Sequence, residues 1–348
     1  MRSQADPSKI NELPACVAIA LNGGDSAIID AAEEANPVLD FAHSAARTLS
    51  ENPKWMECRF LYDARGSALF EQICRQPEYY PTRRETAILH RYAGEICETT
   101  GCVTLAELGC GSAIKTRHIL SAYVKSNGSV RYVPVDVSRS ALQHACAAIT
   151  AWHPAVKVAG IRGTYECAFP FLKALSPVMV LFLGSTIGNL NEDQDRLFWR
   201  NIGRHLSEGD FFLLGVDLVK DTSILEAAYN DRAGVSAAFT LNLFERMNRE
   251  LKTGIDVLHL QHVAYFSSAK SRIEIFAQFN REQRVRIKPL NKSIPISAGE
   301  RIQVEISRKF NLNELVPRLY SCGFATRRIF SDENSWFALL LLEKVAND

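Results

Sequence analysis

The sequence predicts an α/β protein, with an open and mostly parallel sheet joined to a second, β-rich α+β domain. Strand-like and helix-like segments alternate between residues 103 and 217, which is typical of a sheet with helices on both faces. From residue 257 onward, strand-like runs follow one another without helices between them. This change of pattern indicates a second domain of a different kind.

The segments before this alternation are expected to be partly helical. Residues 1–30 show no sustained period and are expected to form an N-terminal extension. Helical patterns cover residues 29–50 and 84–98, whereas residues 53–81 are aromatic-rich and interrupted by Pro and Gly.

The alternating segment divides into apolar strands and amphipathic helices. Strands are expected near 103–108, 131–136, 156–161, 177–184 and 210–217, with helices near 113–124, 138–151 and 192–204. We assign residues 83–219 to this first domain.

The chain after the first sheet changes character. Residues 221–250 have a helical pattern throughout. The segments that follow are expected to be strands at 257–267, 271–286 and 302–310, a helix at 312–322 and a final strand at 335–343. Residues 31–82 together with 220–348 are therefore expected to form the second domain.

The composition is that of a soluble globular protein without a nucleic-acid partner. Hydrophobic residues make up 47% and charged residues 23% of the 348 residues, and the net charge is +1. The apolar run Phe337–Leu342 is far too short to span a bilayer, and the N-terminus lacks a signal-peptide pattern. We expect a cytoplasmic protein that does not contact membranes.

Cysteine and histidine spacing gives no support for a metal site. The nine cysteines include no Cys-x-x-Cys pair, and the eight histidines show no ligand-like spacing. The cysteines are expected to be reduced thiols, and no metal is expected.

A glycine-rich turn follows the first strand of the alternating segment. Glu107 ends an apolar run, and Gly109-x-Gly111 leads into a helical segment. Such glycines let backbone approach a ligand at a helix N-terminus. A third glycine, which dinucleotide binders carry, is replaced by Ile114, and Asp136 follows the next strand where it can meet ribose hydroxyls. The set suits S-adenosylmethionine better than NAD; the alternative is an ordinary strand–turn–helix with a glycine-rich corner.

Asn189 lies where a later apolar strand, Leu181–Leu183, runs into small residues. Ligands of open α/β sheets bind beyond the carboxyl ends of the strands. An asparagine amide there can accept from an amine and donate to a carboxylate at once. The alternative is that Asn189 caps the helix that begins near Asn191.

Three tyrosines stand in turn-like or helical surroundings: Tyr62, Tyr79 and Tyr229. A tyrosine offers an aromatic face to a cation and a hydroxyl to an amine or carboxylate. The alternative for each is a packing aromatic.

Residues 301–310 alternate between apolar and polar side chains. This period places Glu305 and Ser307 on one face of a strand, where a carboxylate and a hydroxyl match the two nitrogens of an imidazole. The alternative is the solvent-facing side of a half-buried strand.

These segments together resemble the histidine-specific N-alpha-methyltransferases of ergothioneine biosynthesis, over about residues 53–343. The resemblance rests on several sequence words in the right order: Tyr62-Asp-Ala-Arg-Gly-Ser67, Pro77-Glu-Tyr-Tyr-Pro-Thr-Arg83, Glu107-Leu-Gly-Cys-Gly-Ser112, Gly184-Ser-Thr-Ile-Gly-Asn189, Ala228-Tyr-Asn-Asp231 and Glu305-Ile-Ser-Arg-Lys-Phe310. It implies a Rossmann-like methyltransferase sheet that binds S-adenosylmethionine, a second domain that binds substrate, and histidine held between the two. We expect a monomer.

The resemblance also implies roles for individual residues. The implied cofactor-binding residues are Tyr62, Gly109, Gly111, Lys115, Asp136, Thr164 and Tyr165. The implied substrate-binding residues are Tyr79, Asn189 and Tyr229 for the amino and carboxylate groups, and Glu305, Ser307 and Ile275 around the imidazole. Tyr79 and Asn189 are also the implied catalytic residues, because they would position the amine. Thr164-Tyr165 replaces the Asp-Phe of bacterial relatives, and Ile275 stands where the family often has methionine.

The implied reaction is the transfer of methyl groups to the alpha-amino nitrogen of L-histidine, up to the trimethylated product. Most of the rate enhancement is expected to come from holding nitrogen, methyl and sulfur in line. Such a proximity effect lowers the activation barrier by up to ~7–11 kcal/mol. Two alternatives stay open: an N-methyltransferase for an indole amino acid and a non-catalytic S-adenosylmethionine-binding protein. An indole has no use for a buried carboxylate, so Glu305 favours histidine.

Overall fold

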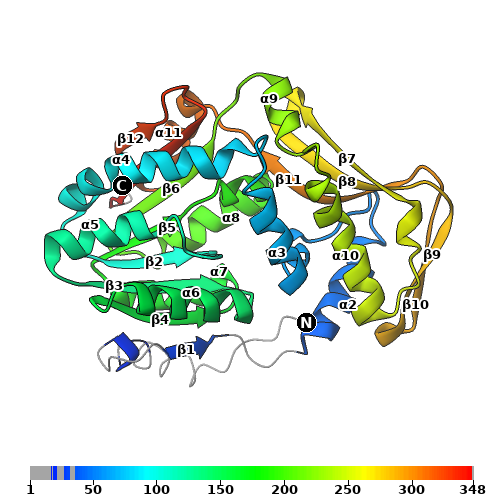
Figure 1. The fold of residues 1–348 in the computed structure, drawn as a ribbon, viewed down its shortest axis with the longest axis horizontal. Coiled ribbons are helices and arrows are strands. Elements are labelled where there is room, and N and C mark those ends of the chain that lie inside the picture. Colours follow the sequence, from blue (N-terminus) through cyan, green and yellow to red (C-terminus); the bar gives the residue numbers. More distant parts are fainter. Residues whose placement is uncertain (1–16, 18, 22–26, 32–35, 347–348) are drawn as a thin grey trace. The chain divides into compact units, whose positions relative to one another are not determined.

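The chain divides into two compact units in the computed structural model, which describes residues 17, 19–21, 27–31 and 36–346. The first unit is built from residues 1–33, 81–218 and 310–348, and the second from residues 34–80 and 219–309. Figure 1 labels the elements of both. Each unit is described by itself below.

An eight-stranded sheet forms the centre of the first unit, in the order β1-β4-β3-β2-β5-β6-β13-β12. Its strands are β1 (Ala27–Asp30), β2 (Thr104–Leu108), β3 (Val130–Asp136), β4 (Val156–Arg162), β5 (Val178–Phe182), β6 (Phe211–Asp217), β12 (Phe324–Ser331) and β13 (Phe337–Lys344). The strands from β1 to β6 pair in parallel, and β13 runs antiparallel to both β6 and β12. The predicted α/β class with a mostly parallel sheet is confirmed.

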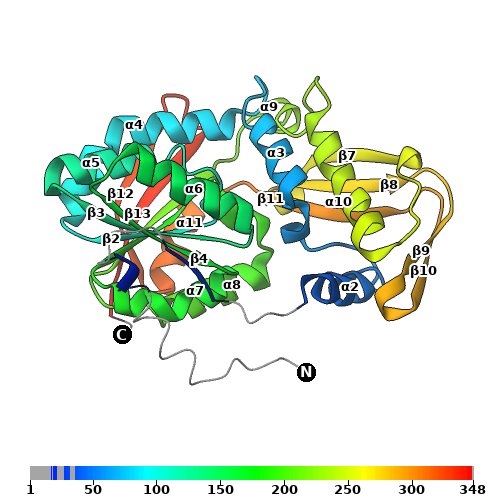
Figure 2. The ribbon, with the colours of Figure 1, turned by 60° about the horizontal axis from the view of Figure 1, so that its bottom comes forward.

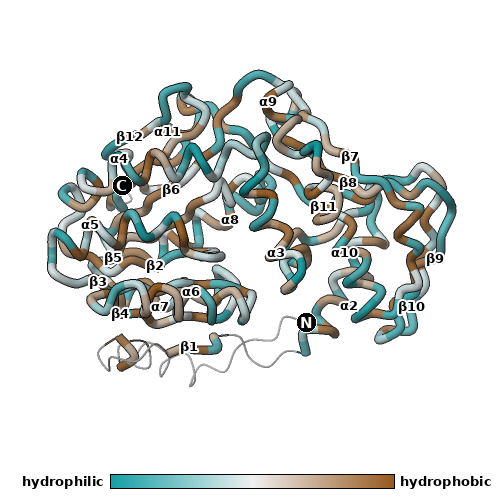
Figure 3. Tube along the Cα trace, in the orientation of Figure 1, coloured by the Kyte–Doolittle hydropathy of each residue, from teal (hydrophilic) through white to brown (hydrophobic). Residues whose placement is uncertain are grey.

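Helices cover both faces of this sheet, as Figure 2 shows. They are α4 (Tyr80–Thr100), α5 (Arg117–Asn127), α6 (Arg139–Trp152), α7 (Tyr165–Leu172), α8 (Glu192–Gly203) and α11 (Leu312–Ser321), with the short 3-10 turns η2 (Lys173–Leu175) and η3 (Thr186–Asn189). One apolar cluster joins the sheet to α4, α5 and α6, and the other joins it to α7, α8 and α11. Strand β5 illustrates this packing on both faces. Its side chains alternate between the two clusters, and all five are buried. Figure 3 shows hydrophobic segments, drawn in brown, among the strands of this sheet.

The second unit combines helices with two small antiparallel sheets, β11-β8-β7 and β10-β9. Its helices are α2 (Pro37–Thr48), α3 (Ala64–Ile73), α9 (Thr222–Ala227) and α10 (Val235–Leu251), with the 3-10 turns η1 (Cys58–Leu61), η4 (Val257–His259), η5 (Ser268–Lys270) and η6 (Lys288–Leu290). Its strands are β7 (Leu260–Ser267), β8 (Arg272–Phe279), β9 (Gln283–Ile287), β10 (Lys292–Ile296) and β11 (Arg301–Arg308). Helix α10 contacts α3 and β7.

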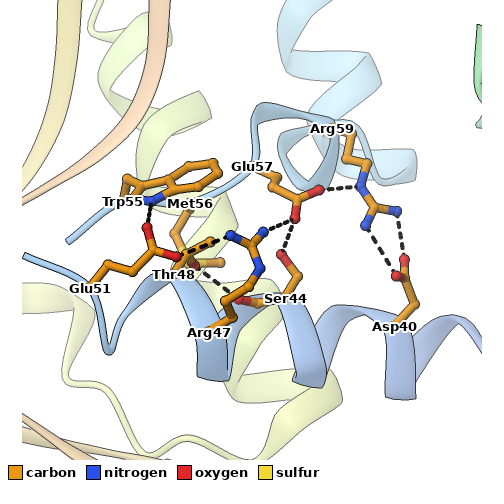
Figure 4. Close-up of polar contacts among 9 residues, drawn as sticks. All are labelled: Asp40, Ser44, Arg47, Thr48, Glu51, Trp55, Met56, Glu57 and Arg59. Carbon is orange, nitrogen blue, oxygen red and sulfur yellow. Dashed lines mark hydrogen bonds and ion pairs between the residues drawn. The ribbon is translucent and has the colours of Figure 1, made fainter. Parts of the chain in front are cut away.

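A polar network ties α2 to the chain that precedes Tyr62 (Figure 4). Glu57 accepts hydrogen bonds from Ser44 at 2.7 Å, from Arg47 at 2.8 Å and from Arg59 at 2.7 Å. Just upstream of Glu57, the Met56 amide donates to the carbonyl of Gln303 at 2.8 Å. The segment that leads into Tyr62 is therefore fixed both to α2 and to β11.

The C-terminal segment belongs to the first unit, so the expected assignment of residues 310–348 to the second domain is wrong for this part of the chain. Strand β13 pairs with β6 over seven residues, from Phe337 opposite Asp217 to Glu343 opposite Phe211. The run Leu339–Leu342 is fully buried. A strand whose side chains are apolar on both faces must be buried on both faces. A position inside the larger sheet, with helices packed on both sides, buries it in this way.

Several predicted segments are shorter than expected or are divided. The helix predicted at 29–50 is preceded by strand β1, which pairs in parallel with β4, and α2 begins only after the cap Asn36. The rest of the predicted extension 1–30 lies mostly outside the described residues. The predicted helix 221–250 divides into α9 and α10, because the turn before α10 places Gly234 at a φ of 72°. The predicted strand 271–286 divides into β8 and β9, and the sequence analysis missed β10 and β12.

Within the described part of the chain, no helix is long and apolar enough to cross a membrane. The same residues contain no group of three or more His, Cys, Asp or Glu side chains placed to hold a metal ion.

Candidate active site

The glycine-rich turn lies where the strand order of the first sheet reverses. Strand β2 has β3 on one side and β5 on the other, which makes its carboxyl end the usual ligand site of an open α/β sheet. Gly109 and Gly111 directly follow β2, are exposed, and have φ values of 74° and 50°. Side chains rarely tolerate this left-handed region, so glycine is needed for this path. The turn therefore presents bare backbone at the switch point.

Asp136 ends β3 and holds the turn through its carboxylate. One oxygen accepts from the Gly111 amide at 3.1 Å and the other from the Ser138 amide at 2.8 Å. Burial raises the pKa of Asp136, and these two hydrogen bonds oppose that shift. A carboxylate accepts about four hydrogen bonds, so acceptor capacity remains for ribose hydroxyls.

Glu107 supports the turn from within the sheet. It is buried and accepts hydrogen bonds from the Thr116 hydroxyl, at 2.8 Å to each oxygen, and from the Tyr132 hydroxyl. Burial raises the pKa of Glu107 to about 7. Thr116 immediately precedes α5, so Glu107 fixes the start of that helix to β2 and β3.

Tyr165 lies against the glycine turn. A Cβ atom on Gly109 would come within 3.2 Å of the Tyr165 hydroxyl, so the missing side chain leaves room for this ring. The ring also contacts Phe182 edge to face, with centroids 5.2 Å apart. Its neighbour Thr164 donates to the sulfur of Cys167 at 3.5 Å. Of the two residues that depart from the family pattern, Tyr165 thus stands beside the turn predicted to bind the cofactor.

Lys115 forms an ion pair with Glu85 of α4, a residue that the sequence analysis did not identify. Glu85 is fully buried and accepts a 2.7 Å hydrogen bond from the Gly184 amide, just after β5. A Cβ atom on Gly215 would come within 2.2 Å of the Glu85 carboxylate, so glycine is required there. Glu85 therefore joins the loops that follow β2 and β5.

Asn189 ends η3 in the loop after β5 and is half-buried. The next helix is capped by Asn191, whose side chain accepts from the Gln194 amide at 2.9 Å while the Gln194 side chain accepts from the Asn191 amide at 2.9 Å. The alternative that Asn189 caps this helix is wrong. Its predicted role toward substrate stays a prediction.

Three polar side chains form a closed triangle in the second unit. The Tyr229 hydroxyl donates to Ser307 Oγ at 2.8 Å, and Lys309 Nζ donates to the Tyr229 hydroxyl at 2.8 Å and to Ser307 Oγ at 2.9 Å. Ser307 and Lys309 are buried. The solvent-facing alternative for this strand is therefore wrong at Ser307.

Glu305 stands two residues before Ser307 and directly opposite Ile275 in the β11–β8 pairing. Burial raises the pKa of Glu305 to about 7, against the opposing effects of Lys309 and of a hydrogen bond from Tyr62. Neighbours across an antiparallel pair share a face, so Ile275 lies beside this carboxyl group. Tyr62 therefore lies with the predicted imidazole-binding residues, and its implied role toward the cofactor stays a prediction.

The three predicted tyrosines belong to one aromatic cluster around Phe70. Its ring centroid lies 5.6 Å from that of Tyr62 and 6.2 Å from that of Tyr79, and the rings of Tyr79 and Tyr229 are 6.1 Å apart. Tyr79 is buried. The packing interpretation thus holds for all three rings. The Tyr229 hydroxyl already contacts Ser307 and Lys309, and the predicted roles toward substrate stay predictions.

His262 supports Tyr229 through the backbone. Its Nε2 lies 2.9 Å from the Tyr229 carbonyl oxygen, and its Nδ1 lies 2.9 Å from the Thr240 hydroxyl. Burial lowers the pKa of His262. Because a carbonyl can only accept, Nε2 carries the proton and Nδ1 accepts from Thr240.

Sequence reasoning missed three residues of these networks: Glu85, His262 and Lys309. Lys309 follows Glu305 and Ser307 at the same two-residue spacing, so strand periodicity could have found it. Glu85 and His262 act through contacts with distant parts of the chain, and no local pattern reveals such contacts.

Comparison with known proteins identifies the family of this chain. A family model described as "Histidine-specific methyltransferase, SAM-dependent" matches residues 41–344. The histidine N-alpha-methyltransferase of Mycolicibacterium smegmatis is 39% identical over 293 residues, which cover 84% of this chain and 91% of that protein. The enzyme of the same description from Mycobacterium tuberculosis is 38% identical over 311 residues, 88% of this chain and 97% of that protein. Ergothioneine biosynthesis protein 1 of Neurospora crassa is 32% identical over 204 residues, 57% of this chain and 23% of that protein.

The family match spans most of the chain, and the two mycobacterial relatives are covered almost completely. The chain belongs to the histidine-specific, S-adenosylmethionine-dependent methyltransferase family.

Proposed function

We propose that this protein transfers methyl groups from S-adenosylmethionine to the alpha-amino nitrogen of L-histidine. The product is N-alpha,N-alpha,N-alpha-trimethyl-L-histidine (hercynine), the precursor used in ergothioneine biosynthesis. One observation carries the proposal: Glu305 and Ser307 present a carboxyl group and a hydroxyl from one strand, two residues apart. Family membership and the description of the mycobacterial relatives support the same substrate.

The residues of the first unit fit S-adenosylmethionine. The exposed left-handed glycines Gly109 and Gly111 leave backbone open to a ligand, and Asp136 keeps acceptor capacity for ribose hydroxyls. We assign Lys115, Thr164 and Tyr165 to the same cofactor site. When bound, S-adenosylmethionine supplies a methyl group on a sulfonium centre. The remaining cofactor assignment, Tyr62 near the methionine end, rests on the family resemblance alone.

We assign the amino acid's alpha-amino and carboxylate groups to Tyr79, Asn189 and Tyr229. An asparagine amide accepts from an amine and donates to a carboxylate, so Asn189 can orient both groups. Tyr79 positions the amine lone pair, and a tyrosine hydroxyl or solvent accepts the proton that the ammonium group loses before each of the three transfers. Tyrosine faces also suit the trimethylammonium group of the product. The reaction needs no covalent intermediate on the protein. The main contribution of the protein is therefore to position the reactants, which can lower the activation barrier by up to ~7–11 kcal/mol.

We further propose that the protein acts as a cytoplasmic monomer. The nine scattered cysteines fit reduced thiols in a cytoplasmic protein, and the monomeric state is an expectation that a size measurement in solution would test.

The indole-amino-acid alternative is tested with a panel of the twenty amino acids. We expect S-adenosylhomocysteine release with histidine and not with tryptophan. An indole has one N–H and no bare nitrogen, so it cannot satisfy both Glu305 and Ser307. In Glu305→Gln, histidine turnover should fall by about 100-fold or more, because a charge-assisted hydrogen bond is lost. Glu282→Gln, an exposed carboxyl of the same unit, is the matched control and should behave as the wild type. Tryptophan turnover above histidine turnover would contradict the proposal, and no turnover of any amino acid would favour the non-catalytic alternative.

A further inference from the structure

The Ser307 hydroxyl oxygen is the acceptor in both of its hydrogen bonds to Tyr229 and Lys309. Its Oγ accepts from the Tyr229 hydroxyl at 2.8 Å and from Lys309 Nζ at 2.9 Å. A serine hydroxyl has two acceptor lone pairs and one O–H donor. These two contacts occupy both lone pairs, so the O–H is left to donate.

Lys309 determines which of the neighbouring hydroxyl groups donates and which accepts. An ammonium group only donates, so its 2.8 Å contact makes the Tyr229 oxygen an acceptor and directs the Tyr229 proton toward Ser307. Lys309 is 3% exposed, and its Nζ lies 4.7 Å from the centroid of the Tyr229 ring. Its backbone amide donates to the carbonyl of Ser271 at 2.7 Å, which anchors it at the end of β11.

Glu305 has the opposite polarity. When ionised, its carboxylate only accepts, and Tyr62 donates to it. The positive charge of Lys309 favours the ionised form of Glu305. The strand thus offers an acceptor at Glu305 and a donor at Ser307.

We propose that Lys309 is a positioning residue that makes Ser307 an obligatory donor, so that the Glu305–Ser307 pair selects a ring with one N–H and one bare nitrogen. This inference rests on the proposed function. Neutral imidazole meets both demands. A pyrrole keeps an N–H and lacks the bare nitrogen, so it would leave the Ser307 hydroxyl without an acceptor. Without Lys309, the Ser307 proton can turn toward the Tyr229 oxygen, and the demand for a bare nitrogen disappears.

The test compares histidine with the two pyrrolylalanines, in which carbon replaces one or the other ring nitrogen. The readout is the ratio of kcat/KM for histidine to that for the better analogue. Where the analogue is not turned over, it is the ratio of the inhibition constant of the analogue to the KM of histidine. Both substrates are measured on one preparation, so partial loss of folded enzyme does not change the ratio. In the wild type we expect a ratio of about 10³ or more, since sites built to hydrogen-bond a substrate reject analogues that leave buried groups unpaired.

Lys309→Met should lower this ratio by about 10-fold or more, because Ser307 is no longer held as a donor. Ser307→Ala should lower it similarly, and Lys309→Met should add no further change in the Ser307→Ala background. Lys309→Arg, which still only donates, should keep the ratio high. The exposed Lys288→Met is the matched control and should leave the ratio unchanged. Lys309→Gln, whose amide can accept, is the second variant if Lys309→Met does not fold, and it should also lower the ratio.

The outcomes separate this inference from the proposed function. Wild-type protein that methylates histidine while its ratio is the same in Lys309→Met, Lys309→Gln or Ser307→Ala would overturn the inference and leave the function standing. Wild-type protein that does not methylate histidine would overturn the proposed function, and this inference with it.

Discussion

Two acidic side chains near the ends of β2 and β3 support the glycine turn. Asp136 accepts from the amides of Gly111 and Ser138, so its carboxylate shapes the glycine turn, and we expect it also to bind the ribose. Glu107, two residues before Gly109, is buried and bonded to Thr116 and Tyr132 instead. The two acidic residues that the sequence grouped together therefore differ in role: one is expected to bind, and the other holds the turn.

Asp136→Ala should weaken S-adenosylmethionine binding by about 1–3 kcal/mol, because charge-assisted hydrogen bonds to ribose and to the Gly111 amide are lost. Isothermal titration calorimetry measures the affinity directly. Asp193→Ala, at an exposed side chain in α8 of the same unit, is the matched control and should bind the cofactor as the wild type does. Unchanged affinity in Asp136→Ala would remove Asp136 from the cofactor site.

At the scale of elements, buried ionisable groups join strands to helices. Glu107 links β2 to the start of α5, and Glu85 links α4 to the loop after β5. In the second unit, His262 of β7 holds the carbonyl of Tyr229, the tyrosine that contacts Ser307 of β11. These links explain how side chains from separate elements keep a fixed geometry.

The stability of the first unit should depend on pH through Glu107. Its pKa is raised by burial from 4.5 to about 7, so the folded state favours the protonated carboxyl group. The resulting stabilisation is fully present below about pH 4.5 and is lost as the pH rises through about 7. Between these limits the free energy of unfolding of the wild type, relative to Glu107→Gln, should fall by about 3 kcal/mol.

Urea unfolding followed by tryptophan fluorescence at a series of pH values checks this prediction, with Glu208→Gln as the control at an exposed carboxyl group. A constant difference between wild type and Glu107→Gln across this range would show that Glu107 is not held as an acid in the folded state.

At the scale of the whole molecule, local periodicity predicted which segments are strands and helices but not their partners. The alternation from residue 103 to 217 gave β2 to β6, and the glycine turn after β2 was expected from sequence alone. The C-terminal strand was also expected, yet its place beside β6 was not. An apolar run indicates that a strand is buried. Which strand pairs with it depends on contacts with residues far away in the sequence.

The same limit applies to the candidate site. Glu305 and Ser307 were found because their two-residue period is visible along one strand, and Lys309 continues that period. Glu85 is visible only once α4 is packed on the sheet, because its partners Lys115 and Gly184 lie 30 and 99 residues away. Local sequence therefore indicated the chemistry of the site, and the tertiary structure added the residues that orient it.

The central claim is that histidine receives its methyl groups on the alpha-nitrogen. The ring nitrogens are expected to be engaged by Glu305 and Ser307, which leaves the amine within the reactive distance of about 3–3.5 Å from the methyl group. Mono- and dimethylhistidine should then serve as substrates. The most direct test is fragmentation mass spectrometry of the product formed with excess S-adenosylmethionine. The account predicts three methyl groups on the alpha-nitrogen and none on the ring; a ring-methylated product, or a reaction that stops after one methyl group, would contradict it.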